Sequence, residues 1–67
     1  MNSTLESKAL EVWQSGKWTW YVLKKWQNND NEFNAKWLCA IVNPDYPSGH
    51  IEDVLVEHVK RQAVRVK

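Results

Sequence analysis

The chain has 67 residues, which suffice for one small domain and not for two. Nine basic and eight acidic residues nearly cancel, which argues against a polycation that coats nucleic acid and against an acidic mimic of nucleic acid. The single cysteine excludes an internal disulfide and gives no zinc-binding spacing, so five tryptophans, two tyrosines and one phenylalanine are the main material for a core.

The N-terminal segment has neither a basic start nor the apolar run of a signal peptide, and the chain contains no apolar stretch of roughly 18 residues that could span a membrane. A single thiol is consistent with a reducing compartment, so we expect a cytoplasmic protein. Residues 1–8 are polar and are expected to be a flexible lead-in to one domain over residues 9–67, although Ser3 or Thr4 could cap a short helical turn.

Residues 9–14 are predicted to form a strand that a tight turn joins to a second strand over residues 17–26, KWTWYVLKKW. A two-residue loop at Ser15 and Gly16 would need a positive φ at Ser15, so we favour a three-residue loop with a left-handed Gly16. One face of the hairpin then carries Leu10, Val12, Trp18, Trp20 and Val22, and the other carries Trp13, Thr19, Tyr21 and Leu23. With the two-residue loop, Glu11 would share the face of Trp18 and Trp20 instead.

The second hairpin is predicted to join this strand to the apolar run 36–42 through a loop at residues 28–31. That loop pairs Trp26 with Phe33, Val22 with Trp37 and Trp20 with Cys39. One face of the three strands is then almost wholly apolar, as a barrel interior requires, with Lys24 and Ala35 near its end. Its apolar members are Leu10, Val12, Trp18, Trp20, Val22, Trp26, Phe33, Trp37, Cys39 and Ile41.

Two prolines and Gly49 mark residues 43–49 as a loop, and no strand is expected to run through it. Residues 51–56 are predicted as a fourth strand, residues 57–61 as a single helical turn and residues 63–66 as a fifth strand. One amphipathic helix over residues 53–64 is the alternative, which the density of valines disfavours.

Five short strands in a meander, with a helical turn before the last, predict an all-β fold, a small five-stranded SH3-like barrel. The alternative is an α+β fold in which a three- to four-stranded antiparallel sheet packs on a C-terminal helix. Neither fold class implies a particular function.

Three segments, WTWYVLKKWQ, KWLCAIV and GHIEDVLVEHV, resemble small uncharacterised Trp-rich proteins encoded by bacteriophages, over residues 17–59. Proteins of that kind are often host-takeover or anti-defence factors that bind a host macromolecule. The resemblance implies a phage factor that acts in the host cytoplasm, and it transfers no site residues.

Few residues are suited to catalysis or metal binding. Cys39 lies in the middle of an apolar strand, and His50 and His58, eight residues apart, match no zinc spacing. A barrel of this size also leaves little room for a substrate pocket. We therefore expect a protein that is not an enzyme and holds no metal or other cofactor.

A protein-binding surface is the function that the residues favour, because tryptophan and tyrosine are enriched at interface hot spots. The predicted outer face is too apolar to stay in water, and its members are Trp13, Tyr21, Leu23, Leu38, Ala40 and Val42. We predict that Trp13, Tyr21 and Trp26 anchor a partner protein, with a charged rim of Lys25 and Lys36. Tyr46, which two prolines present rigidly in the loop at residues 43–49, is a further predicted contact. A homodimer that covers the same face is an alternative.

A binder of single-stranded nucleic acid is the second functional alternative, with bases stacked on the same aromatic rings. Phosphates would then contact the basic C-terminal residues, Lys60, Arg61, Arg65 and Lys67. Trp13 and Tyr21, with Glu11 beside them, are also candidates for an aromatic cage around a methylated lysine.

Overall fold

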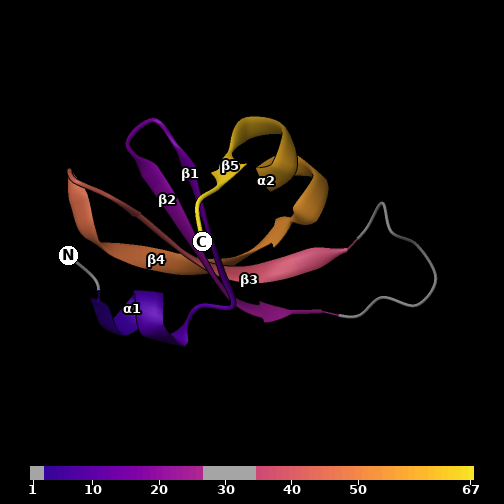
Figure 1. Cartoon of the computed structure of the whole chain (residues 1–67), viewed down its shortest axis with the longest axis horizontal. Coiled ribbons are helices and arrows are strands. Elements are labelled where there is room, and N and C mark those ends of the chain that lie inside the picture. The colour runs from indigo at the N-terminus through magenta and orange to yellow at the C-terminus, as the bar shows by residue number, and fades with distance from the viewer. Residues whose placement is uncertain (1–2, 27–34) are drawn as a thin grey trace.

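The computed structural model describes residues 3–26 and 35–67, which form an antiparallel sheet and two short helices (Figure 1). The elements are α1 (Ser3–Lys8), β1 (Glu11–Ser15), β2 (Trp18–Lys25), β3 (Lys36–Asn43), β4 (Tyr46–Leu55), α2 (Val56–Gln62) and β5 (Val64–Arg65). The strand order β4-β3-β2-β1-β5 confirms a mainly antiparallel β fold with five strands. Over the described residues the sheet is open, with β4 and β5 at its edges, so closure into an SH3-like barrel is not confirmed.

The turn between β1 and β2 contains two residues, Gly16 and Lys17, and not the three that were expected. Ser15 pairs with Trp18, and Gly16 has a φ of 57° whereas the φ of Lys17 is not positive. A glycine of positive φ at the first central position is the pattern of a type II′ turn, whose twist suits a two-residue hairpin.

This register places Trp13 opposite Trp20 and Glu11 opposite Val22, so these four side chains share one face of the sheet. The prediction that Trp13 lies on the same face as Tyr21 is therefore wrong. It failed because the turn has two residues and not three, which moves every β1 side chain to the other face, so that Glu11 shares the face of Trp18 and Trp20 as the two-residue alternative implied.

The pairing of β2 with β3 is shifted by two residues from the predicted register, with Trp20 opposite Ile41 and Val22 opposite Cys39. A shift of two keeps every side chain on its face, so the predicted common face of these residues is confirmed. The predicted loop at residues 28–31 and the partner Phe33 lie outside the described residues.

A bulge between Val22 and Lys24 then changes the alternation along β2. Lys25 lies opposite Trp37, whereas Lys24 lies opposite Leu38 on the other face. Lys24 and Trp26, both predicted to lie on the apolar face, are therefore on the opposite side of the sheet.

The strand β4 begins at Tyr46, inside the segment that was predicted as a loop, because only Pro44 and Asp45 form the turn. The Asn43 side chain closes this turn by accepting a hydrogen bond from the Asp45 backbone amide at 2.7 Å. Proline is tolerated in β4 because this strand is at the edge of the sheet. The prediction of no strand over residues 43–49 is therefore wrong.

The core lies between one face of the sheet, which we call the inner face, and α2 (Figure 1). Val59 of α2 is fully buried against Val22 and Cys39. The core residues are Trp20, Val22, Trp37, Cys39, Ile41, Val54, Val59 and Ala63. The predicted sequence of strand, helical turn and strand at the C-terminus is confirmed, and the alternative helix over residues 53–64 is excluded because β4 extends to Leu55.

The opposite face, which we call the outer face, is the side on which α1 lies (Figure 1). Residues 3–8 thus form the helical segment that was the alternative to a flexible lead-in. Val12, Ala40 and Val42 are buried on this face, whereas Ile51 is 61% exposed. The outer face is therefore only partly covered.

Candidate functional site

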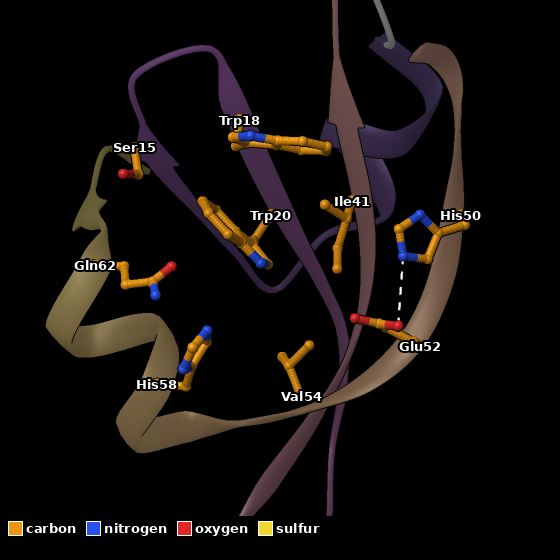
Figure 2. Close-up of a pocket in the computed structure, with 9 residues that line it drawn as sticks. All are labelled: Ser15, Trp18, Trp20, Ile41, His50, Glu52, Val54, His58 and Gln62. Carbon is orange, nitrogen blue, oxygen red and sulfur yellow. Dashed lines mark ion pairs between the residues drawn. The ribbon is translucent and has the colours of Figure 1, made fainter.

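A pocket of about 300 Å³ lies on the inner face between the β1–β2 hairpin, β4 and α2 (Figure 2). We call it the Trp18 pocket. Its lining residues are Ser15, Trp18, Trp20, Ile41, His50, Glu52, Val54, His58 and Gln62.

The floor of the Trp18 pocket is apolar, because Trp20, Ile41 and Val54 are all buried core residues. Trp18 stands above this floor and is 40% exposed. In Figure 2 its indole ring is seen edge-on, so that a flat face is turned towards the hollow. The pocket therefore offers an aromatic surface to a ligand.

Polar side chains from three elements complete the rim of the pocket. His50 and Glu52 come from β4, with 3.4 Å between His50 Nε2 and Glu52 Oε2, while His58 and Gln62 come from α2 and Ser15 from β1 (Figure 2). From their spacing of eight residues, the two histidines were not expected to form a site together. Both are exposed, but the fold brings them to one pocket, which their spacing does not reveal.

Ser15, His50 and Glu52 are residue types used in nucleophilic catalysis, but their arrangement here does not activate the hydroxyl. Ser15 lies across the pocket from the His50–Glu52 pair (Figure 2), whereas a nucleophile and its base must lie within about 2.6–3.2 Å. Burial, with a smaller effect of the Asp53 and Glu52 carboxylates, raises the pKa of Cys39 to about 12, which disfavours a reactive thiolate.

In residues 3–26 and 35–67, no three side chains of the metal-ligating types lie close enough together to hold an ion. Neither helix of this part of the chain has the length and apolar character needed to cross a membrane.

A second aromatic cluster on the inner face joins Trp13 to Trp37, whose ring centroids are 5.7 Å apart at an angle of 44°. Glu11 beside it is 9% exposed and accepts hydrogen bonds from Trp13 Nε1 at 2.9 Å and from Lys25 Nζ. Arg65 Nη1 lies 4.0 Å from the same carboxylate. The buried carboxylate of Glu11 is thus compensated by the positive charges of Lys25 and Arg65.

Burial raises the pKa of Glu11, but the hydrogen bonds from Lys25 and Trp13 and the positive charges of Lys25 and Arg65 outweigh it, so the pKa is lowered from 4.5. A lowered pKa in the folded state means that ionised Glu11 stabilises the fold above its unfolded pKa near 4.5. This contribution is lost as the pH falls through the lower, folded pKa.

We predict that Glu11→Gln lowers the free energy of unfolding by about 1–3 kcal/mol at pH 7, because charge-assisted hydrogen bonds are lost. The difference from wild type should begin to shrink below pH 4.5, where Glu11 of the unfolded chain binds a proton, and should disappear below the lower pKa of the folded state, where Glu11 is protonated in both states. Urea unfolding followed by tryptophan fluorescence between pH 7 and pH 3 measures this. Glu57→Gln, which breaks an exposed pair with Arg61, is the control and should cost at most about 0.5 kcal/mol. A loss in the free energy of unfolding that is as large at pH 3 as at pH 7 would contradict the stabilising role of ionised Glu11.

The three predicted anchors do not form one surface. Trp13 lies on the inner face, whereas Tyr21 and Trp26 are on the outer face, so neither a shared platform nor a methyl-lysine cage joins Trp13 to Tyr21. Trp26 is 42% exposed, donates from Nε1 to Asp53 Oδ1 at 2.5 Å, and has Lys24 Nζ 4.3 Å from its ring centroid.

The other predicted binding residues, Lys25, Lys36 and Tyr46, are also dispersed. Lys25 is engaged with Glu11, and Lys36 is exposed at the start of β3. Tyr46 is 52% exposed and meets the His50 ring edge-on, with 6.3 Å between centroids. Of the predicted binding residues, Tyr46 is therefore the one that adjoins the Trp18 pocket.

The four basic C-terminal residues each contact a group of the chain itself. Arg61 Nη2 is 2.6 Å from Glu57, Lys67 Nζ is 2.8 Å from Glu6, Arg65 Nη1 is 4.0 Å from Glu11, and Lys60 Nζ is 6.0 Å from the Trp37 centroid. They therefore do not form an uncompensated strip for phosphates.

No protein-family model, curated protein or solved structure matches the chain.

Proposed function

We propose that this chain is a small, non-enzymatic binding module that docks on another protein through the Trp18 pocket. The observation that carries the proposal is the half-exposed Trp18 above a buried apolar floor, with polar side chains around it. Interface hot spots have this composition, because an aromatic residue supplies contact area and the polar rim fixes the partner's orientation.

Tyr46 extends the proposed surface beyond the pocket, since its ring contacts His50 at the rim. Pro44 and Pro47 flank it in the sequence and restrict its backbone, which lowers the entropy lost on binding. The binding residues in this proposal are therefore Trp18, Tyr46, His50, Glu52 and His58.

The arrangement of the strands supports an SH3-like domain, because β5, β1, β2, β3 and β4 are consecutive in the sheet and a helix precedes β5. The resemblance to Trp-rich phage proteins supports a host protein as the partner, met in the host cytoplasm. Nucleic acid is the weaker candidate, because the net charge is only +1 and Arg61, Arg65 and Lys67 each lie within 4.0 Å of a carboxylate of the chain.

Affinity capture from nuclease-treated bacterial lysate tests the docking proposal. We expect one retained protein, and we expect Trp18→Ala to reduce its retention at least tenfold, roughly the effect of a hot-spot residue. Trp26→Ala is the matched control, because Trp26 is 42% exposed against 40% for Trp18 and lies on the opposite face. Circular dichroism must show that both variants are folded.

Three results would contradict the proposal. Trp26→Ala could reduce retention as much as Trp18→Ala does, which would remove the role of the pocket. Retention could depend on nucleic acid and disappear after nuclease treatment. The purified chain could instead form a dimer that persists on dilution and that Trp18→Ala dissociates, so that the partner would be a second copy.

A further inference from the structure

The chain places its own cations over two of its tryptophan rings. Lys24 Nζ lies 4.3 Å from the Trp26 centroid, and Lys25 and Lys60 lie 5.1 Å and 6.0 Å from the Trp37 centroid. An ammonium or guanidinium group within about 6 Å of an indole is attracted by the negative face of the ring. These two rings are therefore already occupied from within the chain.

The Trp18 pocket differs from these rings in its charges. All nine lysines and arginines lie in the described part of the chain, and none of them lines this pocket. Among the described residues, the cation–ring contacts involve Trp26 and Trp37 and not Trp18 or Trp20. Within residues 3–26 and 35–67, Glu52 is the only carboxylate in the lining. The pocket thus combines an open indole face with an acidic group and no internal cation.

Given the docking function proposed above, we infer that the Trp18 pocket binds an arginine side chain of the partner protein. A guanidinium is planar, so it can stack on the indole of Trp18 while its N–H groups donate to the Glu52 carboxylate. The Gln62 amide oxygen and the Ser15 hydroxyl, on the side of the pocket away from β4, supply further acceptors (Figure 2). A lysine ammonium could contact the indole face but lacks the planar fork that serves several acceptors at once.

The histidines of the pocket are consistent with this occupant. His50 lies 3.4 Å from Glu52, and its imidazole carries a charge that would compete for the carboxylate only when protonated. His50 and His58 otherwise contribute aromatic walls on opposite sides of the hollow (Figure 2). The lining of the pocket thus offers an arginine side chain two indoles, two imidazoles and one carboxylate.

Titration of the folded chain with small probes tests the inference, with the indole N–H signals of Trp18 and Trp20 followed by NMR. The probes are acetylated, amidated arginine, lysine, trimethyl-lysine and citrulline, the last being the neutral counterpart of arginine. We expect arginine to shift both signals with an affinity at least tenfold above that of citrulline and severalfold above those of lysine and trimethyl-lysine. Glu52→Gln should weaken arginine binding severalfold, and Trp18→Ala should weaken it about tenfold.

Asp53→Asn is the matched control for Glu52→Gln, because Asp53 is the next residue of β4 and its side chain is bonded to Trp26 on the outer face. It should leave arginine binding unchanged. Equal binding of arginine and citrulline, equal binding of arginine and lysine, or no shift with any probe would each overturn the arginine assignment. A captured protein whose retention needs Trp18 but not Glu52 would overturn it too, while leaving the docking proposal in place.

Discussion

Replacing Gly49 by alanine is expected to lower the free energy of unfolding by about 2–5 kcal/mol. Gly49 has a φ of 63°, a left-handed conformation that costs a residue with a Cβ about 1–2 kcal/mol. A Cβ here would also lie 2.5 Å from the Ile41 carbonyl oxygen and 2.9 Å from Val42 Cγ2. Because one of these atoms belongs to the backbone of β3, it cannot move aside without disturbing the pairing of β3 with β4.

Gly16→Ala is the matched control for this substitution. Gly16 has a similar φ of 57°, but nothing lies within 4 Å of the position of its Cβ. It should therefore show only the conformational cost of about 1–2 kcal/mol. Urea unfolding of both variants, followed by tryptophan fluorescence, measures the difference. Equal losses would show that β3 and β4 do not approach each other at the irregularity between Ile41 and Asn43.

Replacing Trp37 by alanine is expected to cost about 3–5 kcal/mol, the range for removing a large aromatic side chain from a core. Trp37 is 7% exposed and contacts Trp13 and the amines of Lys25 and Lys60. For a small domain each kcal/mol lowers the melting temperature by about 4–8 °C, so this variant should melt about 12–40 °C below the wild type.

Trp26→Ala controls for the loss of an indole as such. Trp26 is 42% exposed, and its removal breaks only a surface hydrogen bond to Asp53 and a ring contact with Lys24. We expect a cost below about 1 kcal/mol. Thermal unfolding by circular dichroism compares the two variants. A larger loss of stability for Trp26→Ala than for Trp37→Ala would contradict the position of the core on the inner face of the sheet.

The alternation along the two central strands could be predicted from the sequence. Trp20 and Val22 of β2, and Cys39 and Ile41 of β3, follow a period of two, so they share a face in any register that differs by an even number of residues. That regularity is also why a register error of two residues left Trp20, Val22, Trp37, Cys39 and Ile41 in the core. Other members of the predicted apolar face are not in this core, namely Leu10, Val12, Trp18 and Trp26.

The register of the first hairpin could not be predicted, because it depends on the environment of Glu11. From the sequence alone, a register that buries a carboxylate on the apolar face is disfavoured, since burying an unpaired charge is costly. In the structure Lys25 and Arg65, which are far from Glu11 in the sequence, supply the charges that make its burial acceptable. The bulge at β2 that brings Lys25 to this face has no evident sequence signal.

The Trp18 pocket is likewise a product of tertiary structure. Trp18 comes from β2, His50 and Glu52 from β4, and His58 from α2, so no local spacing connects them. The early start of β4 was missed for a related reason, because the prolines of residues 43–49 are compatible with a strand only when that strand is at the edge of the sheet.

The two-residue turn at Gly16 and Lys17 brings Ser15, Trp13 and Glu11 of β1 to the inner face that carries Trp18 and Trp20, and Ser15 thereby completes the rim of the Trp18 pocket. Backbone nuclear Overhauser effects across the β1–β2 hairpin test it most directly. The structure predicts contacts of Ser15 with Trp18 and of Trp13 with Trp20. Contacts of Gln14 with Trp18 and of Val12 with Trp20 would show a three-residue turn, which would move Ser15 out of the Trp18 pocket, carry Trp13 and Glu11 to the outer face, and contradict the register described here.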